Sequence, residues 1–136
     1  TDMVNSARFL KAHALATGKL GVTGFCWGGS TTNFLAVALG ADLQAAVPFY
    51  GAAAETARVS AIKAPLLIQY AQSDERINAM WPAFETALKA SGARYEMHMY
   101  PGTQHGFHNN STPRYQEAAA KLAWERTIAF FKKHLA

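Results

Sequence analysis

The sequence predicts a three-layer α/β fold, with a mainly parallel sheet lying between helices. Three observations support this: short apolar runs alternate with longer helical patterns, one of those runs is apolar at nearly every position, and 50% of the residues are apolar. A continuous apolar strand is typical of a parallel sheet that is covered on both faces. Because no repeat or flexible linker interrupts the 136 residues, we expect a single domain over residues 1–136.

The first three elements are predicted to be a helix, a strand and a second helix. Residues 3–16 place apolar side chains three and four positions apart, as an amphipathic helix does, and Gly18 is expected to stop it. The stretch KLGVTGF, residues 19–25, is short, apolar and bounded by turn signals, which predicts a strand. Residues 30–39 are small and apolar on nearly all sides, so we expect a buried helix with Gly40 as its C-cap.

Two further strands are predicted to follow, with a loop between them. The stretch LQAAVPFYG covers residues 43–51 and carries Pro48 near its end. The stretch APLLIQYAQ, residues 64–72, is the nearly continuous apolar run that favours a strand buried on both faces.

The last three elements are predicted to be a helix, a strand and a long helix. Residues 78–90 form the helix, which ends at a Ser-Gly-Ala stretch. Residues 94–100, RYEMHMY, alternate like a strand that closes at Pro101 and Gly102. Residues 113–135 form the final helix. The apolar residues available for the side of this helix that faces the sheet are Ala118, Leu122, Trp124, Ile128, Phe131 and Leu135.

Composition argues against several classes of partner. The net charge of +4 comes from 13 basic and 9 acidic residues that are scattered along the chain, so we expect no nucleic-acid partner. The apolar stretches are too short to span a membrane, and the first residues lack the pattern of a secretory signal. The single cysteine allows no internal disulfide. These observations predict a cytoplasmic location.

The lone thiol, Cys26, has the surroundings of a nucleophile elbow. Gly24 and Gly28 flank it at the offsets that such a sharp strand-to-helix turn requires, and Gly29 adds another small residue. An apolar strand is expected before the motif and a small-residue helix after it. Two other interpretations remain open from this stretch alone, a buried structural cysteine and a redox-sensing thiol.

An acid and a histidine follow at the ends of later strands. Asp74 comes after the third predicted strand and His105 after the fourth, and the carboxyl ends of parallel strands meet along one edge of a sheet. Taken separately, Asp74 also suits a helix N-cap, His105 suits an exposed loop, and Glu75 is a rival acid. A nucleophile, an acid and a histidine in this chain order are expected of an α/β hydrolase.

The remaining histidines do not predict a metal site. His13, His98, His108 and His134 have neither the spacing nor the carboxylate neighbours of zinc ligands, although His108 is a candidate rim residue. The glycines around Cys26 lack the lysine and the spacing of a phosphate loop. We therefore expect no metal and no cofactor.

Four stretches of the chain resemble the dienelactone hydrolase family, the carboxymethylenebutenolidase-like α/β hydrolases. They are GFCWGG at the elbow, AVPFYG in the next strand, QSDERI at the acid turn and YPGTQHGFHN at the histidine loop, and the resemblance runs through nearly all 136 residues. It implies an α/β-hydrolase-type fold and cleavage of a small-molecule ester or lactone. In this resemblance Cys26 is the nucleophile, His105 the base and Asp74 the acid that orients it.

The resemblance also implies a pocket and an oxyanion donor. The backbone N–H of Trp27 corresponds to one of the two oxyanion donors. We expect Tyr50, Phe107 and Asn109 to line the substrate pocket, with plain core packing as the alternative for Tyr50 and Phe107. Dienelactone-cleaving members carry an arginine where this chain has Asn109, which argues against dienelactone itself as the substrate.

Family members are normally longer, with several strands ahead of the elbow strand. The resemblance therefore implies that this chain matches the C-terminal part of the fold and lacks the N-terminal strands. The alternative to an active hydrolase is a truncated or impaired remnant that acts only as a folded or interacting unit. In either case the elbow strand is expected to be an open apolar edge, through which the chain would form a homodimer or bind a separate piece.

Overall fold

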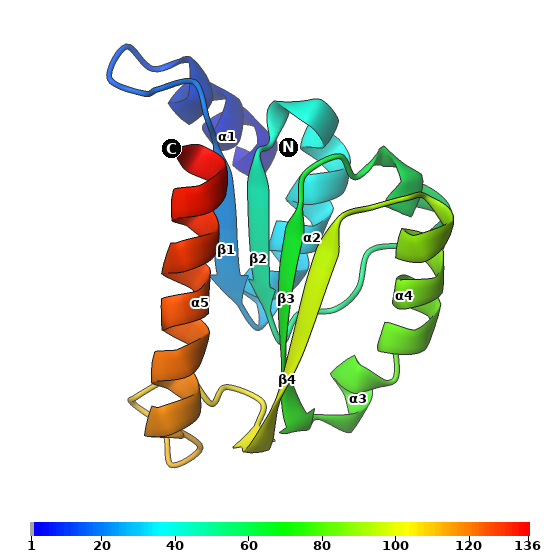
Figure 1. Ribbon diagram of the computed structural model, residues 1–136, viewed down its shortest axis with the longest axis vertical. Coiled ribbons are helices and arrows are strands. Elements are labelled where there is room, and N and C mark those ends of the chain that lie inside the picture. Colours follow the sequence, from blue (N-terminus) through cyan, green and yellow to red (C-terminus); the bar gives the residue numbers. More distant parts are fainter. Residues whose placement is uncertain (1) are drawn as a thin grey trace.

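A four-stranded parallel sheet forms the middle layer of the fold, in the order β1-β2-β3-β4 (Figure 1). The structure is a computed structural model that describes residues 2–136. Its strands are β1 Gly21–Phe25, β2 Ala45–Phe49, β3 Leu66–Ser73 and β4 Tyr95–Gln104. Its helices are α1 Asp2–Ala12, α2 Trp27–Leu39, α3 Glu75–Asn78, α4 Trp81–Ala90 and α5 Glu117–Leu135, with 3₁₀ turns η1 Gly40–Asp42 and η2 Thr56–Ala61. The prediction of a parallel sheet between helices is confirmed.

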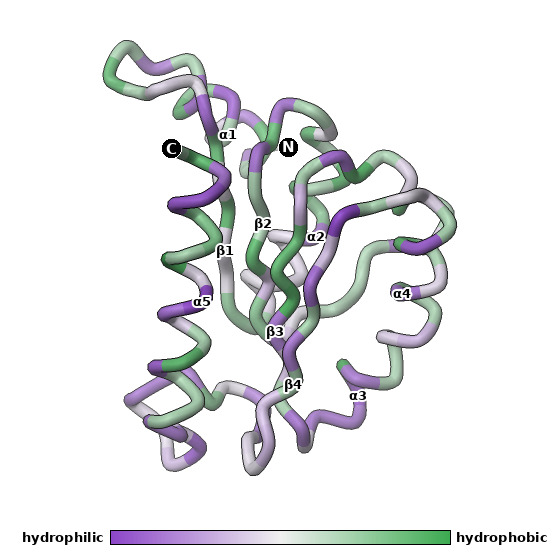
Figure 2. Tube along the Cα trace, viewed as in Figure 1, coloured by the Kyte–Doolittle hydropathy of each residue, from purple (hydrophilic) through white to green (hydrophobic). Residues whose placement is uncertain are grey.

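Each face of the sheet has its own apolar core. Ile68 and Tyr70 of β3 point to the face covered by α2 and α4, while Leu67 and Ala71 of the same strand point to α5. This alternation follows from the strand period of two residues. Figure 2 shows the resulting hydrophobic colouring along the central strands. The prediction that β3 is buried on both faces is therefore confirmed.

One buried polar side chain connects the sheet to α5. Gln69 of β3 is fully buried, and its Nε2 donates to the Ala123 carbonyl at 3.1 Å and to Oγ1 of Thr127 at 2.8 Å. Its Oε1 accepts a hydrogen bond from the Tyr100 hydroxyl of β4. Because all three bonds lie away from water, removing any partner would leave a buried polar group unsatisfied.

The first half of the chain differs from the prediction at its helices. Helix α1 ends at Ala12 rather than at residue 16, and none of its residues is buried; Phe9 is 71% exposed. Helix α2 begins at Trp27 rather than at residue 30, because Cys26 takes the N-cap position directly after β1. The two helices lie on the same side of the sheet, and α1 contacts α2 only lightly.

The second half differs at three boundaries. Strand β4 continues through Pro101 to Gln104, since a proline is tolerated in an edge strand. Its pairing with β3 shifts in register between Ala71 and Ser73 of β3. The predicted helix 78–90 corresponds to α4, which begins at Trp81 because Pro82 favours the first turn of a helix, and the short helix α3 before it was not predicted. Helix α5 begins after Gln116, whose side chain accepts a hydrogen bond from the Ala119 N–H.

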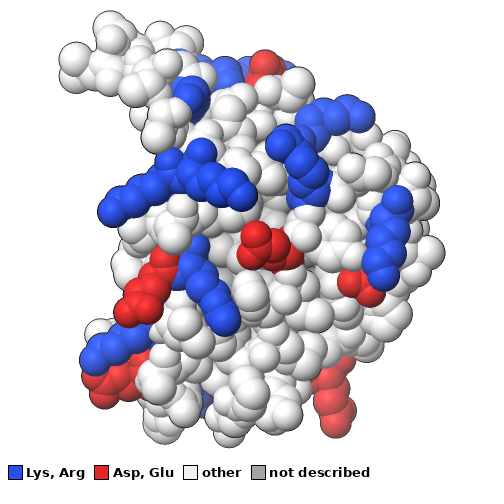
Figure 3. All heavy atoms as spheres, viewed as in Figure 1, with Lys and Arg blue, Asp and Glu red and all other residues white. Residues whose placement is uncertain are grey.

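Charged side chains of both signs are intermixed on the face shown in Figure 3. Among residues 2–136, no helix has both the length and the hydropathy that crossing a membrane requires.

Candidate active site

Cys26 occupies a sharp turn between β1 and α2. Its backbone lies at φ 58° and ψ −118°, in a region that L residues rarely adopt. Its N–H donates to the carbonyl of Phe49 at 3.1 Å, and its own carbonyl accepts from the N–H of Ser30 at 3.1 Å. These two bonds hold a strained residue in place, as expected for a nucleophile elbow.

The glycines of the elbow are required by close backbone approaches. A Cβ on Gly24 would lie 2.2 Å from the carbonyl oxygen of Gly28, and a Cβ on Gly29 would lie 2.4 Å from the carbonyl oxygen of Phe49. At Gly28 itself a Cβ would meet nothing within 4 Å. The need for glycine therefore falls on positions 24 and 29, while position 28 contributes its backbone.

Tyr50 is the second residue with a strained backbone. Among the described residues, only Cys26 and Tyr50 are non-glycine residues with positive φ, and Tyr50 has φ 34°. Its N–H donates to the carbonyl of Gln69 at 2.7 Å. The two residues follow neighbouring strands, so the strain gathers at the carboxyl ends of β1 and β2, where ligands of parallel sheets bind.

The side chains of Asp74 and His105 are in direct contact. Oδ2 of Asp74 lies 2.6 Å from Nδ1 of His105, and the two side chains are 8% and 31% exposed. Since an ionised carboxylate only accepts hydrogen bonds, Nδ1 carries the proton and Nε2 is left as the basic nitrogen. Asp74 is the N-cap residue of α3, but its side chain makes no capping bond. The rival acid, Glu75, is exposed at the start of α3.

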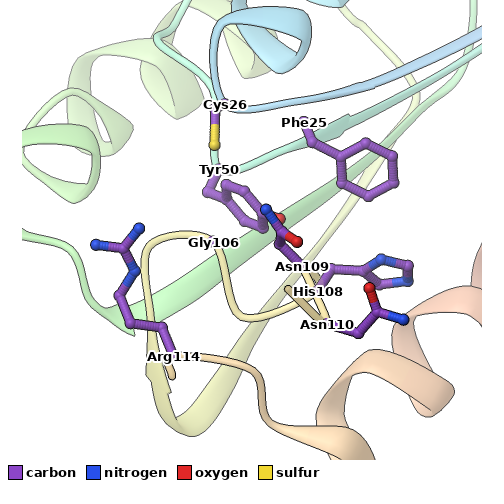
Figure 4. A pocket seen from close by; sticks show the side chains of 8 residues that line it. All are labelled: Phe25, Cys26, Tyr50, Gly106, His108, Asn109, Asn110 and Arg114. Atoms are coloured by element: carbon purple, nitrogen blue, oxygen red, sulfur yellow. The ribbon is translucent and has the colours of Figure 1, made fainter. Parts of the chain in front are cut away.

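A cavity of about 310 Å³ opens beside the thiol (Figure 4). Figure 4 shows the sulfur of Cys26 pointing toward Tyr50, with Arg114 on one side and Phe25 and His108 on the other. The ring of Tyr50 also lies 5.0 Å from the ring of His105, between centroids, which places the histidine next to the cavity. The lining residues are Phe25, Cys26, Tyr50, Gly106, His108, Asn109, Asn110 and Arg114.

The structure places the predicted pocket residues in different environments. Tyr50 and Asn109 line the cavity together with Cys26. Phe107 does not, which corrects the prediction for that residue: it is fully buried and packs against Tyr50 and Tyr100 in the core that faces α5. Its ring supports the cavity wall from behind.

Trp27 directly follows Cys26 and is the first residue of α2. N–H groups in a first helical turn have no acceptor within the helix. Its indole is 76% exposed. The sulfur of Cys26 makes no hydrogen bond within residues 2–136.

The charges around the thiol act in opposite directions. Burial raises the pKa of the Cys26 thiol, the Arg114 guanidinium lowers it, and the Asp74 carboxylate raises it. Burial also raises the pKa of the Tyr50 phenol, as does the nearby Cys26 charge, so Tyr50 stays protonated at neutral pH. The thiol therefore needs a base to become a nucleophile.

Arg114 is a charged cavity residue that the sequence analysis missed, as it did the neighbouring Asn110. It is the only lysine or arginine in residues 101–116, the stretch that contains His105, and this is the signal that would have pointed to it. The guanidinium of Arg114 lies close to Gly106: a Cβ added to Gly106 would be 3.7 Å from Nε of Arg114. It forms no salt bridge with any acid in the described part of the chain.

No group of three or more histidine, cysteine, aspartate or glutamate side chains in residues 2–136 is arranged to hold a metal ion.

Comparisons with known proteins agree with this architecture. A "Putative carboxymethylenebutenolidase" of Salmonella typhi is 33% identical over 127 residues, which cover 85% of this chain and 47% of the relative. A "Probable 2-oxo-3-(5-oxofuran-2-ylidene)propanoate lactonase" of Bradyrhizobium is 29% identical over 147 residues, covering 98% of this chain and 58% of the relative. The chain thus spans about half the length of the curated relatives it matches.

A solved structure and a family model complete the comparison. The crystal structure of a "Putative Dienelactone Hydrolase" from Klebsiella pneumoniae superposes with a TM-score of 0.87 at 29% identity, covering 97% of this chain and 59% of that one. This match confirms the predicted α/β-hydrolase-type fold. The model of the dienelactone hydrolase family matches residues 1–135. The chain belongs to the dienelactone hydrolase family.

Proposed function

We propose that this protein hydrolyses a carboxylic ester or lactone, with Cys26 as nucleophile, His105 as base and Asp74 as the residue that orients His105. The observation that carries the proposal is the 2.6 Å contact between Asp74 and His105, next to a strained cysteine at a strand-to-helix turn. Two of the relatives described above are named for the cleavage of a lactone ring, which supports the same reaction class.

The first half of the proposed reaction forms a thioester. His105 Nε2 takes the proton of the Cys26 thiol, and the thiolate attacks the carbonyl carbon of the substrate. The carbonyl oxygen becomes an oxyanion and accepts a hydrogen bond from the Trp27 N–H, a type of contact worth about 10²–10³ in rate. When the tetrahedral species collapses, the alcohol oxygen leaves with the proton from His105, and an acyl group remains on sulfur.

The second half returns the enzyme to its starting state. His105 removes a proton from a water molecule, whose oxygen attacks the thioester carbon. The carbon–sulfur bond then breaks, the acid leaves, and the sulfur regains its proton. Because a reduced thiol is required throughout, the proposal places the protein in a reducing compartment, for which the cytoplasm is the expected one.

The proposal is tested with p-nitrophenyl acetate and iodoacetamide. Wild-type protein should release nitrophenolate, and alkylation of the single cysteine should abolish the release in step with incorporation of one label. Cys26→Ala and His105→Ala should be inactive, whereas His13→Ala, which removes an exposed histidine of a turn, should match wild type. Equal turnover by wild type and Cys26→Ala would show the proposal to be wrong.

A second candidate function is association through the β1 edge. The two edges of the sheet differ: β4 carries Glu96 and His98, while β1 carries no charged residue, and charged edges are a common protection against pairing. The side of α5 above β1 is apolar, since a Cβ on Gly21 would lie 2.8 Å from both Phe131 and Leu135.

The occupant that we propose for this edge is a second copy of the chain. Two β1 strands related by a two-fold axis would pair as antiparallel neighbours, and each would bring the same apolar α5 stripe to the other. The stripe continues to Ile128, which is 36% exposed and lies on the same side of α5 as Phe131 and Leu135 by helical spacing.

A further inference from the structure

Beside the cavity at Cys26 lies a second hollow that the proposed reaction does not use. It has a volume of about 310 Å³ and is lined by His108, Tyr115, Ala120, Lys121, Trp124 and Glu125. His108 also lines the cavity at Cys26, so a single imidazole forms a wall of both spaces. The two spaces are therefore neighbours across one side chain.

A line of aromatic rings connects the two spaces. Between centroids, the ring of His108 lies 4.9 Å from that of Phe25, the last residue of β1 and the neighbour of Cys26 in the chain, and 5.8 Å from that of Trp124 on α5. Burial lowers the pKa of His108, so the imidazole is neutral at neutral pH and presents an uncharged aromatic surface to both sides.

The hollow itself is shaped by one small and two large side chains. Ala120 is 4% exposed, while Trp124 and Tyr115 remain 43% and 37% exposed, so both aromatic side chains keep surface open to a ligand, Trp124 in addition to its contact with His108. At the rim, the ammonium of Lys121 is paired with Glu117 at 2.5 Å. The hollow therefore offers aromatic walls to a ligand and no unpaired cation.

We propose that this hollow is a subsite for an aromatic or similarly flat apolar group of the ligand. The group would stack on Trp124 while an arm of the same molecule passes His108 and presents its reacting carbon to Cys26. A ligand with an aromatic ring stacks on such exposed aromatic side chains, which typically raises its affinity about twofold to tenfold over that of a ligand without the ring. The assignment as a substrate subsite rests on the proposed function, although binding of the aromatic group does not depend on turnover.

The first test uses alkylation of Cys26, which requires no hydrolysis. The second-order rate constants for N-(2-phenylethyl)iodoacetamide and for iodoacetamide are measured on wild type and on N-acetylcysteinamide. The ratio of the two constants should be about fivefold higher on the protein, and Trp124→Ala should remove most of that preference. Leu122→Ala is the matched control, because Leu122 is 42% exposed on the same helix but does not line the hollow.

The second test compares hydrolysis of p-nitrophenyl 4-phenylbutyrate with that of p-nitrophenyl acetate, as the ratio of their kcat/KM values. Hydrolysis without an aromatic preference overturns the subsite and leaves the proposed function standing. An aromatic preference in alkylation without any hydrolysis overturns the proposed function and leaves the aromatic binding site standing. If circular dichroism shows that Trp124→Ala does not fold, the same rate ratios are measured on Tyr115→Ala instead. Identical ratios in the wall variants and in Leu122→Ala overturn the subsite.

Discussion

Asp74 stands at the N-cap of α3, yet its carboxylate turns away from the helix and contacts Nδ1 of His105 at 2.6 Å. An N-cap aspartate normally accepts hydrogen bonds from the first helical N–H groups, which stabilises the helix by about 1 kcal/mol. This one contributes its acceptor to a histidine instead. The contact is therefore explained better by chemistry at His105 than by the stability of a helix as short as Glu75–Asn78.

Replacing Asp74 by asparagine should have opposite effects on two reactions of the same thiol. Hydrolysis of p-nitrophenyl acetate should fall by about 10²–10⁴, because His105 loses its orienting partner. Alkylation of Cys26 by iodoacetamide at pH 8 should become faster, since the Asp74 charge raises the pKa of the thiol. Glu75→Gln is the control for a neighbouring exposed carboxylate, and parallel losses in both reactions would contradict this account.

The pH dependence of alkylation should report the burial of Cys26. Because burial raises the pKa of the thiol, the alkylation rate should still be increasing above about pH 8.5, where a free cysteine is half ionised. The same shift means that the thiol proton stabilises the folded state at lower pH and that this contribution is lost as the pH rises through the folded-state pKa. Stopped-assay mass spectrometry across the pH range gives the profile.

The Arg114→Gln variant should move this profile to higher pH. The guanidinium lowers the pKa of the Cys26 thiol, so its loss should slow alkylation at pH 8 by about 1.5-fold to 5-fold, as for an exposed charge pair. Arg58→Gln, an exposed arginine on η2, should leave the rate unchanged. A faster reaction in Arg114→Gln would mean that the guanidinium does not act on the sulfur.

The elbow glycines should respond very differently to alanine. Gly24→Ala should lose more than about 3 kcal/mol of unfolding free energy or fail to fold, because its Cβ would lie 2.2 Å from the Gly28 carbonyl oxygen. Gly28→Ala meets no atom within 4 Å and lies in α2, so it should be neutral or gain up to about 1 kcal/mol. Urea unfolding followed by circular dichroism measures both; similar losses would place the strain elsewhere.

Association through β1 should be visible in solution. Size-exclusion chromatography with light scattering should give a mass above that of the monomer, and Ile128→Glu should lower it by adding a charge to the apolar stripe above β1. Leu122→Glu introduces the same charge at a similarly exposed position on the opposite side of α5 and should have no effect. A monomer at all concentrations for wild type would exclude the dimer.

The sequence predicted the elements that depend on local patterns. The apolar run of β3 and the glycines around Cys26 are visible without a structure, because burial on both faces and a sharp turn each require particular residue types in consecutive positions. The strand ends then follow from the parallel order, and so does the expectation that Asp74 and His105 would lie at the same edge.

What the sequence did not predict depends on contacts between distant residues. The burial of Phe107 is determined by its packing against Tyr100 on β4, and the position of Arg114 by how the loop after β4 folds back over Gly106. Likewise, β4 runs past Pro101 because the strand is at the edge, which only the pairing order reveals. Local propensity carries no information about any of these.

The register shift between Ala71 and Ser73 has a consequence for how this region tolerates change. In a strand, one residue more or less turns every later side chain to the opposite face. Between the pairs Ala71–Tyr100 and Ser73–Gln104, β3 advances by two residues and β4 by four, so the two extra residues lie on β4, just before His105. Because two is an even number, the side chains on either side of the irregularity keep their faces. A single-residue deletion within residues 101–103 would instead turn the imidazole away from Asp74 while the core strands stay paired. Insertions and deletions in this segment are thus the changes that separate the fold from its chemistry.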